Sequence, residues 1–146
     1  ERKSTSYDVK EVGNNYYMNE FSAAIGLAQL SKLKKMISKR KIIAKKYFNE
    51  LELEDKMPFS TNCSYHLYWI SVKNRDKFRK ILTSKGIESG THYRPIHSFS
   101  LYHKNYSLPN TEKIGRQIIT IPIYPDLTNY EIDKIITTIN KINSKF

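Results

Sequence analysis

The chain has few of the residues that mark special scaffolds. Its 146 residues include one cysteine, five glycines and five prolines. The lone Cys63 cannot form an internal disulfide, and no cysteine or histidine cluster has the spacing of a zinc site. No apolar run approaches the roughly 20 residues that a membrane-spanning helix needs. These absences exclude a disulfide-stapled domain, a collagen-like repeat and a membrane span, so we expect a reduced, cytoplasmic protein that binds no metal.

An initiator methionine and a signal segment are missing as well. The chain opens on Glu1, Arg2 and Lys3, without the charged-then-apolar pattern of a secretory signal. Its length suits one domain with a real core, because 39 % of its residues are hydrophobic. We therefore expect a folded piece of a longer protein.

Acidic residues are scarce, with 14 against 25 lysines and arginines, which gives a net charge of +11. The segment 32–46 carries eight of these cations and no acid, so its own charge is +8. Apolar residues in and around it recur at helical spacing along one stripe: Leu30, Leu33, Ile37, Ala44, Tyr47, Phe48 and Leu51. The pattern predicts an amphipathic helix whose cations coat solvated faces, with no nucleic-acid partner. Binding of a polyanion by this basic helix stays open as the alternative.

Hydrophobic periodicity and turn residues predict an α+β fold, in which helices pack on a small sheet and a long helical segment lies near the N-terminus. Residues 1–18 are predicted as an extended lead-in and residues 19–146 as a small domain. Asn19 is the expected N-cap of a helix that continues to about Leu53. Gly26 within this helix is an expected point of close packing between helices.

The middle of the chain is predicted to contain two strands around a helix. The first strand, over 65–73, is apolar on both faces and is expected to be central in the sheet. The helix over 75–84 is expected to stop at Gly86. A short second strand is predicted over 87–93.

The C-terminal third is predicted to begin with a loop over 94–109 and to be mostly helical after it. Asn110 is the expected cap of a short helix through Ile118, and the prolines that follow confine the next strand to an edge or a brief segment. Thr128 is expected to cap the last helix, whose inward stripe is Ile132, Ile135, Ile136, Ile139 and Ile142.

Two segments carry candidate functional residues. Residues 13–20 (GNNYYMNE) form a turn that leads into a helix, where backbone N–H groups and side-chain amides can meet an anion such as phosphate. Residues 91–103 hold three of the four histidines, beside tyrosines and Arg94, a mixture that suits a polar, aromatic or phosphorylated ligand. Simple helix capping and a polar loop are the structural alternatives. Neither segment has a nucleophile elbow, a Walker loop or a Rossmann glycine pattern.

Taken together, these segments resemble the C-terminal region of the DegT/DnrJ/StrS-type sugar aminotransferases. The opening block, 13–20, followed by 23–30 (AAIGLAQL), is the specific part of the resemblance. Downstream blocks follow in the family's order, at 66–68 (HLY), 86–87 (GI), 92–97 (HYRPIH) and 122–128 (PIYPDLT). The resemblance covers nearly the whole chain.

The resemblance implies a pyridoxal-phosphate-dependent homodimer of fold type I, which transfers an amino group, usually from glutamate, to a nucleotide-linked keto-sugar. The chain would be its small C-terminal domain, with residues 1–18 leading in from the large domain. Asn15 would reach the cofactor phosphate held in the neighbouring subunit. His92 and Tyr93 match positions that line the nucleotide-sugar pocket, and Tyr17 stands at a substrate-contact position where the family commonly has arginine.

The resemblance also implies that no catalytic residue lies in this chain. The lysine that holds the cofactor, the aspartate that pairs with its ring nitrogen and the aromatic that stacks on the ring would all belong to the large domain. We therefore expect the chain alone to be inactive. Two alternatives stay open: a related pyridoxal-phosphate-dependent sugar dehydratase, in which histidine replaces that lysine, and a free-standing, catalytically dead interaction module with a basic helix.

Overall fold

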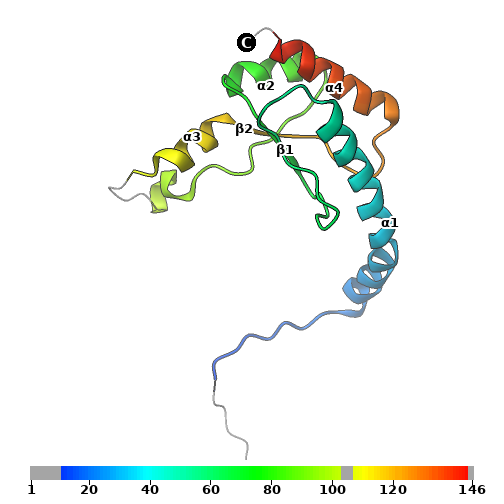
Figure 1. The fold of residues 1–146 in the computed structure, drawn as a ribbon. Helices are drawn as coiled ribbons and strands as arrows, with labels where there is room; N and C mark the ends of the chain where they lie inside the picture. The colour runs from blue at the N-terminus through cyan, green and yellow to red at the C-terminus, as the bar shows by residue number, and fades with distance from the viewer. Residues whose placement is uncertain (1–10, 103–106, 145–146) are drawn as a thin grey trace, which may run out of the picture. The chain divides into compact units, whose positions relative to one another are not determined.

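A computed structural model describes residues 11–102 and 107–144 of the chain. Its elements, in chain order, are α1 (Glu20–Glu50), β1 (Tyr68–Ser71), α2 (Arg75–Ser84), the 3-10 turns η1 (Ile96–Ser98) and η2 (Ser100–Tyr102), α3 (Pro109–Gln117), β2 (Ile118–Ile121) and α4 (Asn129–Asn143) (Figure 1). The predicted α+β class, with a small sheet and a long helix near the N-terminus, is confirmed. The chain divides into two compact units, residues 1–33 and residues 34–146, and each is described by itself.

Helix α1 begins where the sequence predicts and ends slightly earlier. The Asn19 side-chain oxygen accepts the N–H of Ser22 at 2.8 Å, which confirms the N-cap. The helix ends at Glu50 instead of near Leu53, because Asn140 of α4 binds the chain there. Its amide donates to the carbonyl of Glu50 at 2.9 Å, and its oxygen accepts the N–H of Glu52 at 2.9 Å. One side chain from α4 thus satisfies two backbone groups at the end of α1.

The sheet consists of β1 and β2, paired antiparallel from Tyr68↔Ile121 to Ser71↔Ile118. Strand β1 is shorter than predicted, because Tyr65 takes a left-handed backbone conformation (φ 51°) that bends the chain before the strand. Only one face of β1 is fully buried, and the described sheet has two strands, so β1 is not the central strand that its two apolar faces predict. An isolated bridge from Lys56 to Ile70 borders its second edge.

The predicted strand over 87–93 is wrong. Gly86 (φ 70°) ends α2 as predicted, with the N–H of Ile87 donating to the carbonyl of Leu82 at 3.0 Å. After this turn the segment touches β2 through a single bridge, in which Gly90 and Thr120 exchange two backbone hydrogen bonds of 3.0 Å. His92 then folds back onto Thr120, so the ladder cannot continue.

Helix α3 starts differently from the prediction. Pro109 occupies the first helical turn, where a missing N–H costs nothing, so Leu108 and not Asn110 takes the cap position. The Glu112 carboxylate accepts the N–H of Leu108 at 3.1 Å in place of a side-chain cap. The strand that follows, β2, is brief, as the prolines predict.

The core lies between the sheet, α2, α4 and the C-terminal part of α1. The five isoleucines predicted for the inward face of α4 are all buried there. The stripe predicted along the basic helix is buried only near its C-terminal end, at Ala44, Tyr47 and Leu51. Leu30 and Leu33 are 64 % and 44 % exposed, so the part of the chain that the structure describes does not cover them.

Helix α4 begins with a capping box, which yields a stability prediction. Thr128 Oγ1 accepts the N–H of Glu131 at 3.2 Å, and the Glu131 carboxylate accepts the N–H of Thr128 at 2.8 Å. We expect Thr128→Ala to lower the free energy of unfolding by about 1 kcal/mol at pH 7. Urea unfolding of the wild type and the variant measures this difference.

The same cap sets a pH dependence. Hydrogen bonds from the backbone and then the hydroxyl of Thr128 lower the pKa of Glu131 below its ordinary value. A lowered folded-state pKa means that the stabilisation is complete above the pKa of the unfolded chain and is lost as the pH falls through the folded one. The difference in the free energy of unfolding between wild type and Thr128→Ala should therefore become smaller in acid. It should not vanish, because Thr128 Oγ1 still accepts the N–H of Glu131.

Candidate functional site

The first candidate segment has no regular structure over residues 13–19, and its last residue, Glu20, begins α1. Asn15 and Tyr17 are both exposed, and the Asn15 side-chain oxygen accepts the N–H of Tyr17 at 3.1 Å. This local turn engages the oxygen of the Asn15 amide. Its NH2 group has no hydrogen-bond partner among the described residues, so it is available to an acceptor.

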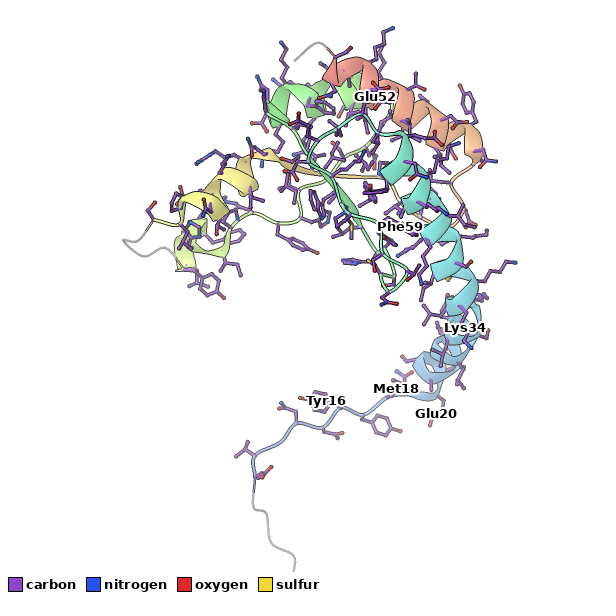
Figure 2. All side chains as sticks on the ribbon, viewed as in Figure 1. Tyr16, Met18, Glu20, Lys34, Glu52 and Phe59 are labelled. Atoms are coloured by element: carbon purple, nitrogen blue, oxygen red, sulfur yellow. The ribbon has the colours of Figure 1, made fainter. Side chains whose placement is uncertain are left out.

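The surroundings of Asn15 are unusually apolar for an exposed segment. Tyr16 and Met18 are 86 % and 66 % exposed, and large apolar side chains continue to be exposed along the first turns of α1 (Figure 2). Large apolar side chains that gather on one exposed segment are typical of a face that another surface covers. Within the described residues a Cβ on Gly26 would meet nothing within 4 Å, so the predicted close packing of Gly26 between helices does not occur there. The sequence predicted an apolar stripe on this helix, but not that its N-terminal part is exposed.

The second candidate segment contains His92 and Tyr93, which a cis peptide bond joins. His92 Nδ1 lies 2.7 Å from Thr120 Oγ1 on β2, and the two aromatic rings meet edge to face at 4.8 Å. Both residues are exposed, Tyr93 at 72 %. The imidazole of His92, which Thr120 holds at Nδ1, and the phenol of Tyr93 therefore lie side by side at the surface.

Other polar residues of this segment hold the loop itself. The Arg94 guanidinium donates to the hydroxyl and carbonyl oxygens of Ser98 and lies 5.2 Å over the ring of Phe99. His97 Nε2 lies 3.4 Å from the Glu112 carboxylate, whose pKa is lowered chiefly by the N–H of Leu108. Arg94 and His97 therefore have structural partners. The predictions over 103–106, His103 among them, lie outside the described residues.

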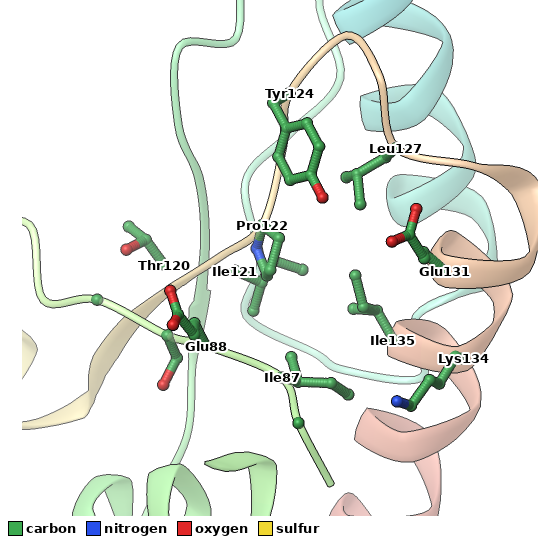
Figure 3. A pocket seen from close by; sticks show the side chains of 13 residues that line it. Ile87, Glu88, Thr120, Ile121, Pro122, Tyr124, Leu127, Glu131, Lys134 and Ile135 are labelled. Atoms are coloured by element: carbon green, nitrogen blue, oxygen red, sulfur yellow. The ribbon is translucent and has the colours of Figure 1, made fainter.

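A cleft of about 650 Å³ lies between the 86–90 turn, the end of β2 and α4 (Figure 3). Its polar lining includes Glu88, Thr120, Glu131 and Lys134, and Glu131 belongs to the capping box of α4. No single sequence motif signalled this cleft, since its walls come from two separate segments, 86–90 and 120–135. Thr120, whose hydroxyl lies 2.7 Å from Nδ1 of His92, lines this cleft as well.

Residues 11–102 and 107–144 contain neither a cluster of metal ligands nor a helix that could span a membrane. Within them no three histidine, cysteine, aspartate or glutamate side chains gather as metal ligands would. No helix in these ranges is both long enough and apolar enough to cross a membrane.

Several solved structures share the fold of the chain. The chain shares 29 % identity and a TM-score of 0.79 with a DegT/DnrJ/EryC1/StrS aminotransferase from Brucella abortus, covering 96 % of this chain and 40 % of that one. It shares 25 % identity and a TM-score of 0.82 with DesV from S. venezuelae, solved with a ketimine intermediate, covering 98 % and 41 %. Helicobacter pylori PseC, an aminotransferase of pseudoaminic acid biosynthesis, matches in fold at 24 % identity, TM-score 0.80, over 100 % and 43 %.

The chain therefore spans about two fifths of the length of these solved proteins. A family model agrees with them over nearly all of its residues. That model describes the DegT/DnrJ/EryC1/StrS aminotransferase family and matches residues 1–140. The chain belongs to the DegT/DnrJ/EryC1/StrS aminotransferase family.

Proposed function

We propose that the chain is the C-terminal part of a cytoplasmic, homodimeric, pyridoxal-phosphate-dependent enzyme that transfers an amino group from glutamate to a nucleotide-linked keto-sugar. The match to the family over residues 1–140 is the observation that carries this proposal. The shared fold with aminotransferases, one of which holds a reaction intermediate, supports it. Since the chain spans only two fifths of those proteins, the rest of the enzyme would supply the cofactor lysine.

Asn15 fits a role in holding the cofactor phosphate. Its NH2 group is exposed and without a partner among the described residues, and it precedes the N-terminus of α1 by five positions. A helix N-terminus favours a nearby anion, and an amide donates to phosphate without adding a charge. Pyridoxal phosphate, when bound, supplies an electron sink for the reaction. The part of Asn15 is to orient it through the phosphate.

His92, Tyr93 and Tyr17 fit contacts to the substrate. Their side chains are exposed and combine hydrogen-bonding groups with aromatic faces, which suits a ligand that carries sugar hydroxyls, a base and phosphates. Tyr17 offers a phenol where an arginine would offer a fixed charge. Its contact would therefore be a neutral hydrogen bond or a stacking contact.

The test is made on the full-length protein. Borohydride reduction should fix a pyridoxyl group on it, and 15N-glutamate should deliver 15N to one of a panel of UDP- and dTDP-linked keto-hexoses. A deoxygenated sugar without 15N would instead identify the related dehydratase. Absence of a pyridoxyl group would contradict the aminotransferase but not the dehydratase, which has no lysine to be fixed. Absence of both the pyridoxyl group and any sugar product would contradict both enzymes and leave the interaction module.

The basic segment 32–46 offers a test that distinguishes the proposed enzyme from the alternative, an interaction module. Part of its charge has internal partners, since Lys39 lies 3.2 Å from Asp126 and Lys46 pairs with Asp133, which raises the pKa of Lys46. Lys34 and Lys35 are exposed. We expect Lys34→Gln/Lys35→Gln to leave kcat/KM for amino transfer within about twofold, because exposed charges contribute little. A marked loss, together with salt-sensitive binding of heparin by the wild type alone, would favour the module.

A further inference from the structure

The His92 ring contacts two residues, Thr120 and Gly90, which we call the seat of His92. The first of them supplies a hydroxyl from the core. Thr120 is 5 % exposed, in a core otherwise filled by aliphatic and aromatic side chains. A buried hydroxyl without a partner is costly, and the partner found for Thr120 is Nδ1 of His92, at 2.7 Å. The hydroxyl of Thr120, at the edge of the core, thus contacts one nitrogen of the exposed His92 ring.

Gly90 completes this seat. Its backbone exchanges two hydrogen bonds of 3.0 Å with Thr120, and the neighbouring Ser89 carbonyl accepts a hydrogen bond of 3.1 Å from Arg79 of α2. A Cβ at position 90 would lie 2.8 Å from Cε1 of His92 and 2.8 Å from Oγ1 of Thr120. The imidazole therefore packs directly on the Gly90 backbone, in space that any other residue would fill.

We propose that Thr120 and Gly90 are positioning residues that fix the His92 imidazole by Nδ1 and leave Nε2 to bind the substrate. This inference rests on the proposed function, in which His92 contacts a nucleotide-linked sugar. Among the described residues Nε2 has no partner, so it is the nitrogen available to a sugar or phosphate oxygen. A threonine hydroxyl donates to Nδ1 of the neutral ring and accepts from the protonated ring, so the seat holds His92 in both states.

The kinetic test uses the full-length enzyme loaded with its cofactor and the keto-sugar that it aminates. Thr120→Val keeps the shape of the strand residue and removes the hydroxyl. We expect its KM to rise about fivefold with kcat nearly unchanged, as for lost binding of one hydrogen bond. Thr120→Ser, the matched control, keeps the hydroxyl and should stay within about twofold of wild type.

A double variant separates positioning from a general structural effect. Because Thr120 is proposed to act through His92, Thr120→Val/His92→Ala should have the KM of His92→Ala alone. If the two losses add, Thr120 acts elsewhere and the inference is overturned. The same conclusion follows if Thr120→Val is indistinguishable from wild type.

A second readout does not depend on the substrate. Ring 15N shifts of His92, assigned by comparison with His92→Ala and recorded above the histidine pKa, should report one tautomer in wild type and Thr120→Ser. They should report an averaged imidazole in Thr120→Val and Gly90→Ala. Unchanged shifts in Thr120→Val would overturn the inference. Suppose that the shifts change in Thr120→Val but that His92→Ala leaves the KM unchanged. This result would support the positioning of His92 and contradict the substrate role given to it.

Discussion

Replacing Asn15 should release the cofactor from the full-length enzyme. The Asn15 NH2 group is the donor proposed for the cofactor phosphate, and a hydrogen bond to a charged group contributes about 1.5 to 3 kcal/mol. We expect Asn15→Ala to raise the Kd for pyridoxal phosphate roughly 10- to 100-fold. Equilibrium dialysis with detection of cofactor absorbance measures this change.

A charge variant makes the test sharper. Asn15→Asp keeps an oxygen that can accept the N–H of Tyr17, so the local turn is retained while the donor is lost. It also places a negative charge beside a phosphate, so its loss should exceed that of Asn15→Ala. Asn14→Ala is the matched control, because the Asn14 amide contacts the Tyr16 hydroxyl at 3.4 Å. We expect this variant to leave the Kd for pyridoxal phosphate unchanged. Wild-type affinity in Asn15→Asp would refute the assigned role.

Removing the Tyr47 ring should have the largest effect on stability. Tyr47 is fully buried, meets Tyr68 edge to face at 5.2 Å and donates its hydroxyl to the carbonyl of Pro122 at 2.8 Å. Tyr47→Ala removes these contacts and leaves a cavity, so we expect a loss of about 3 to 5 kcal/mol. Tyr47→Phe loses only the hydrogen bond and should cost about 1 kcal/mol.

Urea unfolding of the 146-residue chain measures these differences. Tyr130→Ala in α4 is the control, because its side chain is 77 % exposed and should change the free energy of unfolding by less than about 0.5 kcal/mol. A Tyr47→Ala variant as stable as this control would show that the ring is not part of the core.

Local signals in the sequence predicted most of the helices. The caps at Asn19 and Thr128 and the stop at Gly86 depend on neighbouring residues, so they are readable from a short window. The end of α1 depends on Asn140, which no window around Glu50 contains. A boundary set by a distant partner is therefore not readable from a short window. The start of α3 was mispredicted for a different reason, since its signal, Pro109, is local.

The same reason explains the errors in the sheet and the site. Residues 87–93 have the composition of a strand, yet the Thr120 hydroxyl draws His92 out of the ladder after Gly90. The sequence identified His92 as a candidate but held no sign of Thr120 or Gly90 beneath it. Likewise, the spacing of Leu30 and Leu33 predicted a helical stripe correctly in period, and only the fold shows that the described core does not reach them.

The clasp between α1 and α4 also bears on the order in which the chain folds. Three side-chain hydrogen bonds tie Glu50 and Glu52 to Asn140 and Asn143, across 88 to 91 positions of sequence. During synthesis, these bonds at the end of α1 therefore cannot form until α4 has left the ribosome. Closing so long a loop is slow relative to helix growth. Amide hydrogens at the start of α1 should gain protection from exchange before the N–H of Glu52 does.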